Sequence, residues 1–217
     1  MRLWPSALIQ RVQLWYGERQ VSLLAPLFSP GDTVLDFGCG DGALAERLAA
    51  RVPGLQVTGV DVVDSPPRQR IRFVKYTGSA LPFEDQSFDV LLAYHVLHHC
   101  DDPAAALREC CRVARRRVLL VEPTVRSILD LPAMRGSDWL FNAWKPEPVP
   151  MPYQFQRRDR WRSLLHGYGF SIEREDRVGV FPSWLPIGET LLFSAARTRE
   201  AGRAGRPGAA VVMEAPA

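Results

Sequence analysis

A glycine-rich loop at residues 38–42 constrains the fold of this chain more than any other feature. The loop reads Gly-Cys-Gly-Asp-Gly and follows the short apolar run Thr33–Phe37. It precedes a segment in which Leu44 and Leu48 are one helical turn apart. Glycines allow the backbone to turn sharply and to approach a ligand closely. The order of strand, glycine loop and helix therefore predicts the nucleotide-binding corner of an α/β domain.

The remainder of the chain continues the alternation of strands and helices. Apolar runs bounded by turn residues predict strands, and segments with helical periodicity predict helices. We expect strands at 33–37, 56–60, 71–76, 88–94, 118–122, 171–178 and 189–196, and helices at 6–27, 41–51, 103–113 and 157–168. This alternation predicts a parallel sheet with helices on both faces.

The second expected strand leads into Asp61, which lies 19 residues after Gly42. A carboxylate at this position can accept hydrogen bonds from a ribose diol. Gly38, Gly40 and Ala43 also satisfy the G-x-G-x-x-A dinucleotide pattern, so the loop alone does not separate NAD from other nucleosides. The carboxylate of Asp36 favours a cationic ligand, such as the amino-acid end of S-adenosylmethionine (SAM), over a pyrophosphate.

Five ordered motifs within residues 30–123 resemble those of the class I SAM-dependent methyltransferases, in particular the type 11 methyltransferase domain. The motifs are Asp36-Phe-Gly-Cys-Gly40, Gly59-Val-Asp61, Leu81-Pro-Phe83-Glu-Asp-Gln-Ser-Phe88-Asp89, Val96-Leu-His98-His99 with Asp102-Pro103, and Glu109–Val113 with Val121-Glu-Pro123. The resemblance implies a Rossmann-like α/β fold. Its sheet would have seven strands, mostly parallel, with an antiparallel last strand.

The resemblance also implies a cofactor and a reaction, namely methyl transfer from SAM to a small-molecule acceptor by in-line displacement. The residues implied to bind SAM are Asp36, Gly38, Gly40, Asp61, Val62, Thr77, Gly78 and Tyr94. Family members often carry an Asp at the position of Thr77, so we expect a hydroxyl or a backbone group to contact the adenine instead. The three arginines at 115–117 replace the family's Pro-Gly-Gly turn, and we expect them to alter a surface loop.

No residue is assigned a catalytic role by the sequence. Tyr94, His95 and Glu122 are expected near the carboxyl edge of the sheet, and Tyr94 and His95 are candidate bases for an acceptor that must lose a proton. Packing or hydrogen bonding is an alternative role for His95. Tyr16, on the expected N-terminal helix, is a candidate to close over the methionine end of SAM.

We expect no metal site. His98 and His99 are adjacent, and neighbouring residues of a helix turn to different faces. No accompanying set of Asp, Glu or Cys ligands is evident in the sequence. The paired cysteines at 110–111 are also adjacent and do not form a chelating spacing.

The chain divides into three parts in this interpretation. Residues 1–28 form an N-terminal helical cap, residues 29–196 the methyltransferase domain, and residues 197–217 a disordered tail rich in Arg, Ala, Gly and Pro. Within the domain, residues 124–156 are an insertion expected to cover the acceptor. Its aromatic residues either line an apolar pocket or pack the insertion onto the domain: Trp139, Phe141, Trp144, Tyr153 and Phe155.

Composition limits the remaining possibilities. The length of 217 residues suits one α/β domain, and the net charge of +3 is too small to indicate a nucleic-acid partner. The four cysteines include no CxxC pair, which favours reduced thiols in the cytoplasm, and no apolar run has the length of a membrane span. The oligomeric state is not determined. A non-catalytic SAM-binding module and a nicotinamide-dependent oxidoreductase remain as alternative functions.

Overall fold

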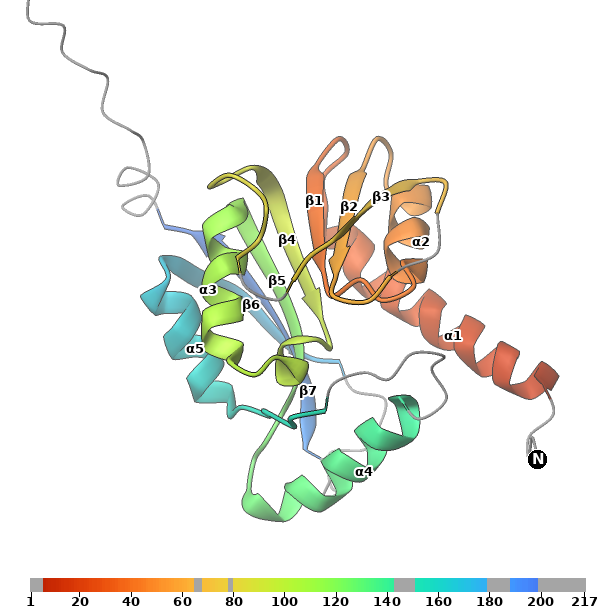
Figure 1. The fold of residues 1–217 in the computed structure, drawn as a ribbon, viewed down its shortest axis with the longest axis vertical. Helices are drawn as coiled ribbons and strands as arrows, with labels where there is room; N and C mark the ends of the chain where they lie inside the picture. Colours follow the sequence, from red (N-terminus) through yellow and green to blue (C-terminus); the bar gives the residue numbers. More distant parts are fainter. Residues whose placement is uncertain (1–5, 65–67, 78–79, 143–150, 179–187, 199–217) are drawn as a thin grey trace, which may run out of the picture.

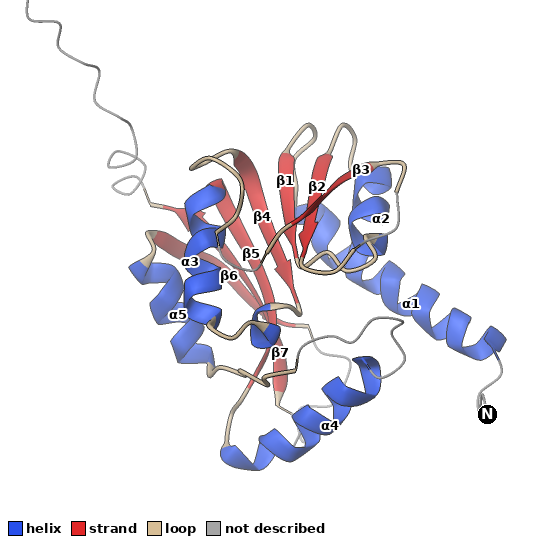
Figure 2. Cartoon of the chain, viewed as in Figure 1, coloured by secondary structure: helices blue, strands red, loops and turns tan. Residues whose placement is uncertain are grey.

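The computed structural model describes residues 6–64, 68–77, 80–142, 151–178 and 188–198. Its centre is a seven-stranded sheet with the order β3-β2-β1-β4-β5-β7-β6 (Figures 1 and 2). The strands are β1 (Thr33–Phe37), β2 (Gln56–Asp61), β3 (Ile71–Lys75), β4 (Phe88–Tyr94), β5 (Ala114–Thr124), β6 (Phe170–Arg177) and β7 (Glu189–Arg197). Strands β1 to β5 pair in parallel, whereas β7 is antiparallel to both β5 and β6. The predicted Rossmann-like sheet with an antiparallel last strand is confirmed.

Helices cover both faces of the sheet. The helices are α1 (Ser6–Leu24), α2 (Ala43–Arg51), α3 (Pro103–Val113), α4 (Leu131–Asn142) and α5 (Arg158–Gly167), with short 3-10 helices η1 (Ala25–Leu27), η2 (Leu97–His99) and η3 (Ile128–Asp130). Helices α3 and α5 lie over one face, and α1 and α2 over the other (Figure 1). Helix α4 lies beyond the end of the sheet where the parallel strands finish. None of the helices in the described ranges is long and apolar enough to cross a membrane.

The core consists of two apolar layers, one on each face of the sheet. Successive residues of a strand point to opposite faces, so a central strand must be apolar at every position. In β4, Leu91 packs with the layer under α3 and α5, and Leu92 with the layer under α1 and α2. In β5, Leu120 packs with the layer under α3 and α5, and Leu119 with the layer under α1 and α2. This double burial explains why these strands read as continuous apolar runs in the sequence.

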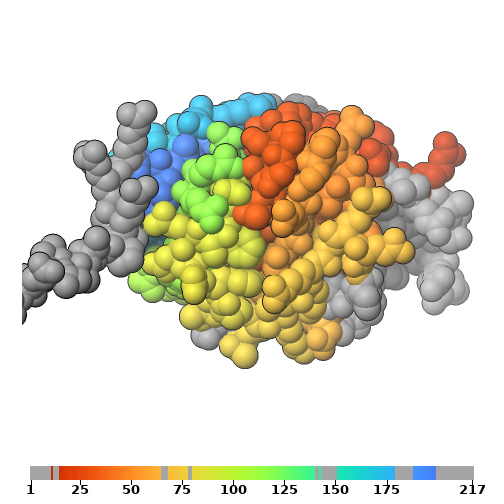
Figure 3. Space-filling model, turned by 90° about the horizontal axis from the view of Figure 1, so that it is seen from above, coloured from red at the N-terminus to blue at the C-terminus, as the bar shows by residue number. Residues whose placement is uncertain are grey.

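Strand β5 is longer than predicted, and the expectation that residues 115–117 alter a surface loop is wrong. These arginines belong to β5. Arg116 Nη2 lies 2.5 Å from Asp32 Oδ1, and Arg115 Nη1 lies 2.9 Å from Asp89 Oδ1. Figure 3 shows green atoms from the middle of the chain beside red atoms from its first part. Ion pairs with acidic residues of neighbouring segments thus allow a strongly polar sequence to continue the strand.

Within the predicted insertion at 124–156, residues 131–142 form helix α4, which was not among the predicted helices. The expected tail falls almost entirely at 199–217, outside the described residues. The predicted domain boundaries at 28 and 196 stay predictions. The helix predicted at 6–27 ends as an α-helix at Leu24 and continues as the 3-10 turn η1.

The core predicts a clear contrast between two leucine substitutions. Leu119 is 0% exposed in the middle of β5, whereas Leu129 is 77% exposed on η3. We expect Leu119→Ala to lower the free energy of unfolding by about 2–5 kcal/mol, because it leaves a cavity between sheet and helices. Leu129→Ala should change it by less than ~0.5 kcal/mol. Urea denaturation measures both, and equal effects would contradict this assignment of the core.

Candidate functional site

The glycine loop turns directly after β1 and leaves its backbone open. Gly38 and Gly40 have positive φ angles of 70° and 55°, which L side chains rarely adopt. A Cβ on Gly38 would lie 2.0 Å from Cγ2 of Val96, so only glycine fits there. A Cβ on Gly40 would meet no described atom within 4 Å. The loop is therefore closely packed against Val96 at Gly38, whereas its backbone at Gly40 leaves room for a ligand.

Asp61 joins the end of β2 to this loop. The Gly40 amide donates to Asp61 Oδ2 at 2.8 Å, and the Val63 amide donates to Asp61 Oδ1 at 3.1 Å. Each carboxylate oxygen has a second lone pair that can accept a further hydrogen bond. The structure therefore brings Gly40 and Asp61 together, as the sequence predicted, and leaves Asp61 able to accept a ribose hydroxyl.

Asp36 lies in β1, immediately before the loop, and is 3% exposed. Burial raises the pKa of its carboxyl group to about 7, and the nearby charge of Asp61 adds to the shift. Two carboxylates in one buried corner disfavour each other's ionised forms. A cation bound beside them would relieve this repulsion, so the corner suits a positively charged ligand.

The other residues predicted to bind the cofactor are spread around this corner. Val62 follows Asp61 and is 42% exposed, which leaves an apolar side chain open next to the carboxylate. Thr77 is exposed two residues after β3, and Gly78 lies outside the described residues. Tyr94 ends β4, and hydrogen bonds link it to Tyr16 and Gln20 of α1. Helix α1 thus reaches the carboxyl end of β4, and the role of Tyr16 at the methionine end of SAM stays a prediction.

Burial raises the pKa of the Tyr94 hydroxyl above its usual range, and the contact with Tyr16 adds to the shift. Tyr94 is therefore neutral at physiological pH. The ring of His95 stacks on that of Tyr94 with centroids 4.7 Å apart. His95 has a φ of 51°, and burial lowers the pKa of its imidazole to about 4. An imidazole with such a low pKa is a weak base. The catalytic role of His95 stays a prediction.

Glu122, near the end of β5, is completely buried and accepts three hydrogen bonds. The amides of Val96 and Leu97 donate to its Oε1 at 2.7 Å each, and His98 Nδ1 lies 2.6 Å from its Oε2. Burial opposes the charged form of His98, but Glu122 and Asp138 together outweigh it and raise the pKa of His98 to about 9. Glu122 therefore positions His98 and, together with Asp138, favours its protonated form.

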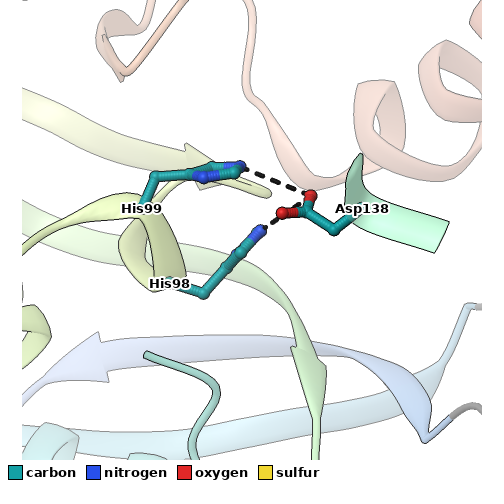
Figure 4. A group of neighbouring side chains, drawn as sticks. All are labelled: His98, His99 and Asp138. Carbon is teal, nitrogen blue, oxygen red and sulfur yellow. Dashed lines mark ion pairs between the residues drawn. The ribbon is translucent and has the colours of Figure 1, made fainter. Parts of the chain in front are cut away.

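Two reasons were given against a metal site: adjacent histidines should diverge, and no acidic or cysteine ligands accompany them. Both reasons are wrong. His98 and His99 both point toward Asp138 of α4 (Figure 4). His98 Nε2 lies 3.5 Å, and His99 Nε2 3.6 Å, from Asp138 Oδ1. The two histidines converge because residues 97–99 form a 3-10 turn, and the carboxylate comes from a helix that the sequence did not predict. Their ligand atoms all lie within 4.8 Å of one another, a grouping that can hold a metal ion.

Residues 35–121 match a family model described as a methyltransferase domain. The match includes the glycine loop, Asp61, the end of β4 and most of β5, and the strand order with a reversed β7 accompanies it. Over these residues, which are less than half of the chain, the protein is similar to the methyltransferase domain family. This confirms the resemblance on which the predicted fold and cofactor pocket were based.

Curated proteins similar to this chain include a ubiquinone biosynthesis O-methyltransferase of Hahella chejuensis. It is 34% identical over 97 residues, which are 40% of this chain and 40% of that protein. The chain thus matches less than half the length of this curated relative.

Solved structures share the fold over most of the chain. A SAM-dependent methyltransferase from Methanosarcina mazei has a TM-score of 0.61 at 20% identity, with 81% of this chain and 97% of that chain covered. The magnesium protoporphyrin IX methyltransferase of Synechocystis, solved with bound SAM, has a TM-score of 0.59 at 19% identity, with 84% and 81% covered.

Sequence reasoning missed the contact between the histidines after β4 and α4. Asp138 carried no signal, because a single acidic residue in a stretch without predicted structure resembles any solvated side chain. Glu122 carried a partial signal, because it was expected near the carboxyl edge of the parallel strands, where side chains from different strands meet. His98 was not assigned to that edge.

The pKa of Asp36 predicts an effect on stability. A carboxyl group with a raised pKa in the folded state stabilises the fold at low pH, and this stability is lost as the pH rises from about 4 to about 7. We expect Asp36→Asn to raise the Tm of the ligand-free protein at pH 8 by ~3 °C or more, and by less at pH 5. The matched Asp64→Asn, at an exposed ion pair with Lys75, should show no such pH dependence. An unchanged or lower Tm of Asp36→Asn at pH 8 would contradict the prediction.

Proposed function

We propose that this chain is a SAM-dependent methyltransferase that transfers a methyl group to a small-molecule acceptor. The observation that carries the proposal is the corner formed by Asp36, Asp61 and the open backbone of Gly40 at the carboxyl edge of the sheet. SAM combines a ribose diol, which needs a hydrogen-bond acceptor, with a sulfonium and an ammonium group, which need negative charge. The match of residues 35–121 to a methyltransferase domain supports the same cofactor.

The reaction requires little chemistry from the protein. The nucleophilic atom of the acceptor forms a bond to the methyl carbon, the carbon–sulfur bond breaks, and its electron pair remains on sulfur, giving S-adenosylhomocysteine. A proton leaves the acceptor if its nucleophilic atom carries one. Because the sulfonium is already activated, holding donor and acceptor in line supplies most of the rate, up to ~7–11 kcal/mol of the barrier.

Within this proposal, each residue at the carboxyl edge contacts a different part of the cofactor. Asp61 accepts from the ribose hydroxyls, and the backbone at Gly40 runs along the methionine part. Asp36 contributes negative charge to the corner. Val62 offers apolar surface to the adenine, with Thr77 as a further contact. Tyr94, joined to Tyr16 of α1, covers the methionine end.

A small acceptor is supported by the region beyond the sheet edge. The ring of Phe155 stacks on that of His98 with centroids 5.0 Å apart, and Tyr153 lies beside Phe155. Trp139 of α4 is 58% exposed. These aromatic side chains support an apolar acceptor, and the relatives named for O-methylation in ubiquinone biosynthesis support a small one. Of the other two predicted aromatic residues, Phe141 has no described side chain and Trp144 lies outside the described residues.

The proposed domain organisation follows from the same reasoning. Residues 1–28 act as a cap that brings Tyr16 to the cofactor, and residues 29–196 form the catalytic domain. Residues 124–156, which contain α4, cover the acceptor. The alternatives are a domain that binds SAM without turnover and a nicotinamide-dependent oxidoreductase. The second alternative would place a pyrophosphate beside Asp36, where two carboxylates repel it.

The proposal predicts that cofactor affinity depends on Asp61. We expect Asp61→Ala to weaken SAM binding at least ~10-fold, because the ribose loses its acceptor and the Gly40 amide loses its partner. The control Asp64→Ala, three residues further on in an exposed ion pair, should bind SAM as the unchanged protein does. Isothermal titration calorimetry measures the Kd of each variant.

Three results would decide between the functions. Loss of binding in Asp61→Ala alone, together with formation of S-adenosylhomocysteine when a panel of small hydroxylated aromatic acceptors is added, supports the proposal. Tight SAM binding with no turnover on any acceptor favours the non-catalytic module. No SAM binding at millimolar concentration, or tighter binding of NADH than of SAM, overturns the proposal.

A further inference from the structure

We infer that His98, His99 and Asp138 form a binding site for a divalent transition-metal ion. The histidines come from η2, directly after β4, and the aspartate comes from the middle of α4. Figure 4 shows the two imidazole rings directed at one carboxylate from different elements. The site is separate from the glycine loop and Asp61, and its existence does not depend on the proposed methyl transfer.

Two distances within the cluster are close to those between neighbouring ligands of a metal ion. Asp138 Oδ1 lies 3.5 Å from His98 Nε2 and 3.6 Å from His99 Nε2. Ligand bonds of about 2.0–2.1 Å to a tetrahedral zinc place neighbouring ligand atoms about 3.3–3.4 Å apart. The three ligand atoms all lie within 4.8 Å of one another, so a metal ion would draw the two imidazoles closer together.

The surroundings of His98 are those of a metal-binding imidazole. Histidine ligands commonly donate their second ring nitrogen to a carboxylate, which orients the ring and selects the tautomer. Here His98 Nδ1 lies 2.6 Å from Oε2 of the fully buried Glu122. Two backbone amides hold the other oxygen of Glu122 in place. His98 Nε2 is the ring atom that faces Asp138, and it becomes a ligand when a metal ion displaces its proton.

The cluster also contains a polar atom that the protein leaves unsatisfied. Asp138 Oδ2 is buried and has no hydrogen-bond partner among the described residues. Asn142 and both histidines lie against Oδ1 instead. A buried carboxylate oxygen without a partner costs free energy, so its presence needs an explanation. A cation between the carboxylate and the two imidazoles supplies that partner.

The ligand types select the class of metal. Two imidazoles and one carboxylate suit Zn²⁺ and Fe²⁺, whereas Mg²⁺ and Ca²⁺ prefer oxygen ligands throughout. Three protein ligands also leave a coordination position open, which is typical of catalytic rather than structural sites. The site lies at the carboxyl edge of β4 and β5, and the ring of His95 is 6.4 Å from that of His98.

Cobalt titration of the full chain without an affinity tag tests the inference. After removal of metals by a chelator, we expect Co²⁺ to bind with one equivalent per chain and to produce the visible absorption bands of a four- or five-coordinate site. Zn²⁺ should displace it stoichiometrically, and millimolar Mg²⁺ should not. Absence of Co²⁺ and Zn²⁺ binding at 100-fold excess over the protein would overturn the inference.

Variants locate the site. Asp138→Asn and His99→Gln should each weaken Zn²⁺ binding at least ~10-fold, and Glu122→Gln by ~10–100-fold through the orientation of His98. His166→Gln is the matched control, because His166 is an exposed histidine in the last turn of α5. Equal Zn²⁺ affinity in Asp138→Asn, His99→Gln and His166→Gln would show binding elsewhere and overturn the inference.

Two further readouts separate this inference from other failures. Thermal unfolding of each variant shows whether it is folded, and the changes at Asp138 and His99 keep Glu122 paired with His98, so these two variants carry the test. Calorimetry with SAM on the same samples is independent of the cobalt spectrum. A cobalt site without SAM binding would overturn the proposed function alone, and SAM binding without a cobalt site would overturn the metal inference alone.

Discussion

The carboxylate of Glu122 holds together the two halves of the candidate site. A fully buried charge is costly unless it is paired and hydrogen-bonded, and Glu122 has three donors. Two of them are the amides of Val96 and Leu97, which fixes the turn after β4. The Val96 side chain then lies against Gly38, in the space that a Cβ would occupy. One buried carboxylate thus positions the packing behind the glycine loop and, through its third donor, the imidazole of His98.

The charged groups on the two sides of Glu122 are arranged differently. On the cofactor side, Asp36 and Asp61 are both acidic and form no ion pair with a cationic side chain of the described residues. Burial and mutual repulsion therefore raise the pKa of Asp36. Such a corner is unfavourable without a cation, and this unfavourable energy is released when a cation binds. On the other side, His98 lies between the carboxylates of Glu122 and Asp138. The first arrangement lacks a positive charge, whereas the second already places an imidazole between two carboxylates.

The predictable part of the site consists of residues whose role depends on the local chain. A strand followed by Gly38 and Gly40 requires positive φ angles that glycine accepts, and Asp61 follows its strand at a spacing that returns it to the same edge. Parallel pairing brings these ends together without any further information. The arginines of β5 were misplaced for the opposite reason. Their place in a strand depends on acidic partners that are distant in sequence, such as Asp32.

The sequence by itself determined the Rossmann-like sheet, the glycine loop and the pairing of that loop with Asp61, because strand periodicity and glycine conformations are properties of short segments. Only the tertiary structure decided the surroundings of His98 and His99. Two adjacent histidines converge only because a 3-10 turn, held by Glu122, replaces a regular helix. Asp138 joins them only because α4 lies across the end of the sheet. Contacts of this kind depend on how whole elements pack, and no local pattern of residues records them.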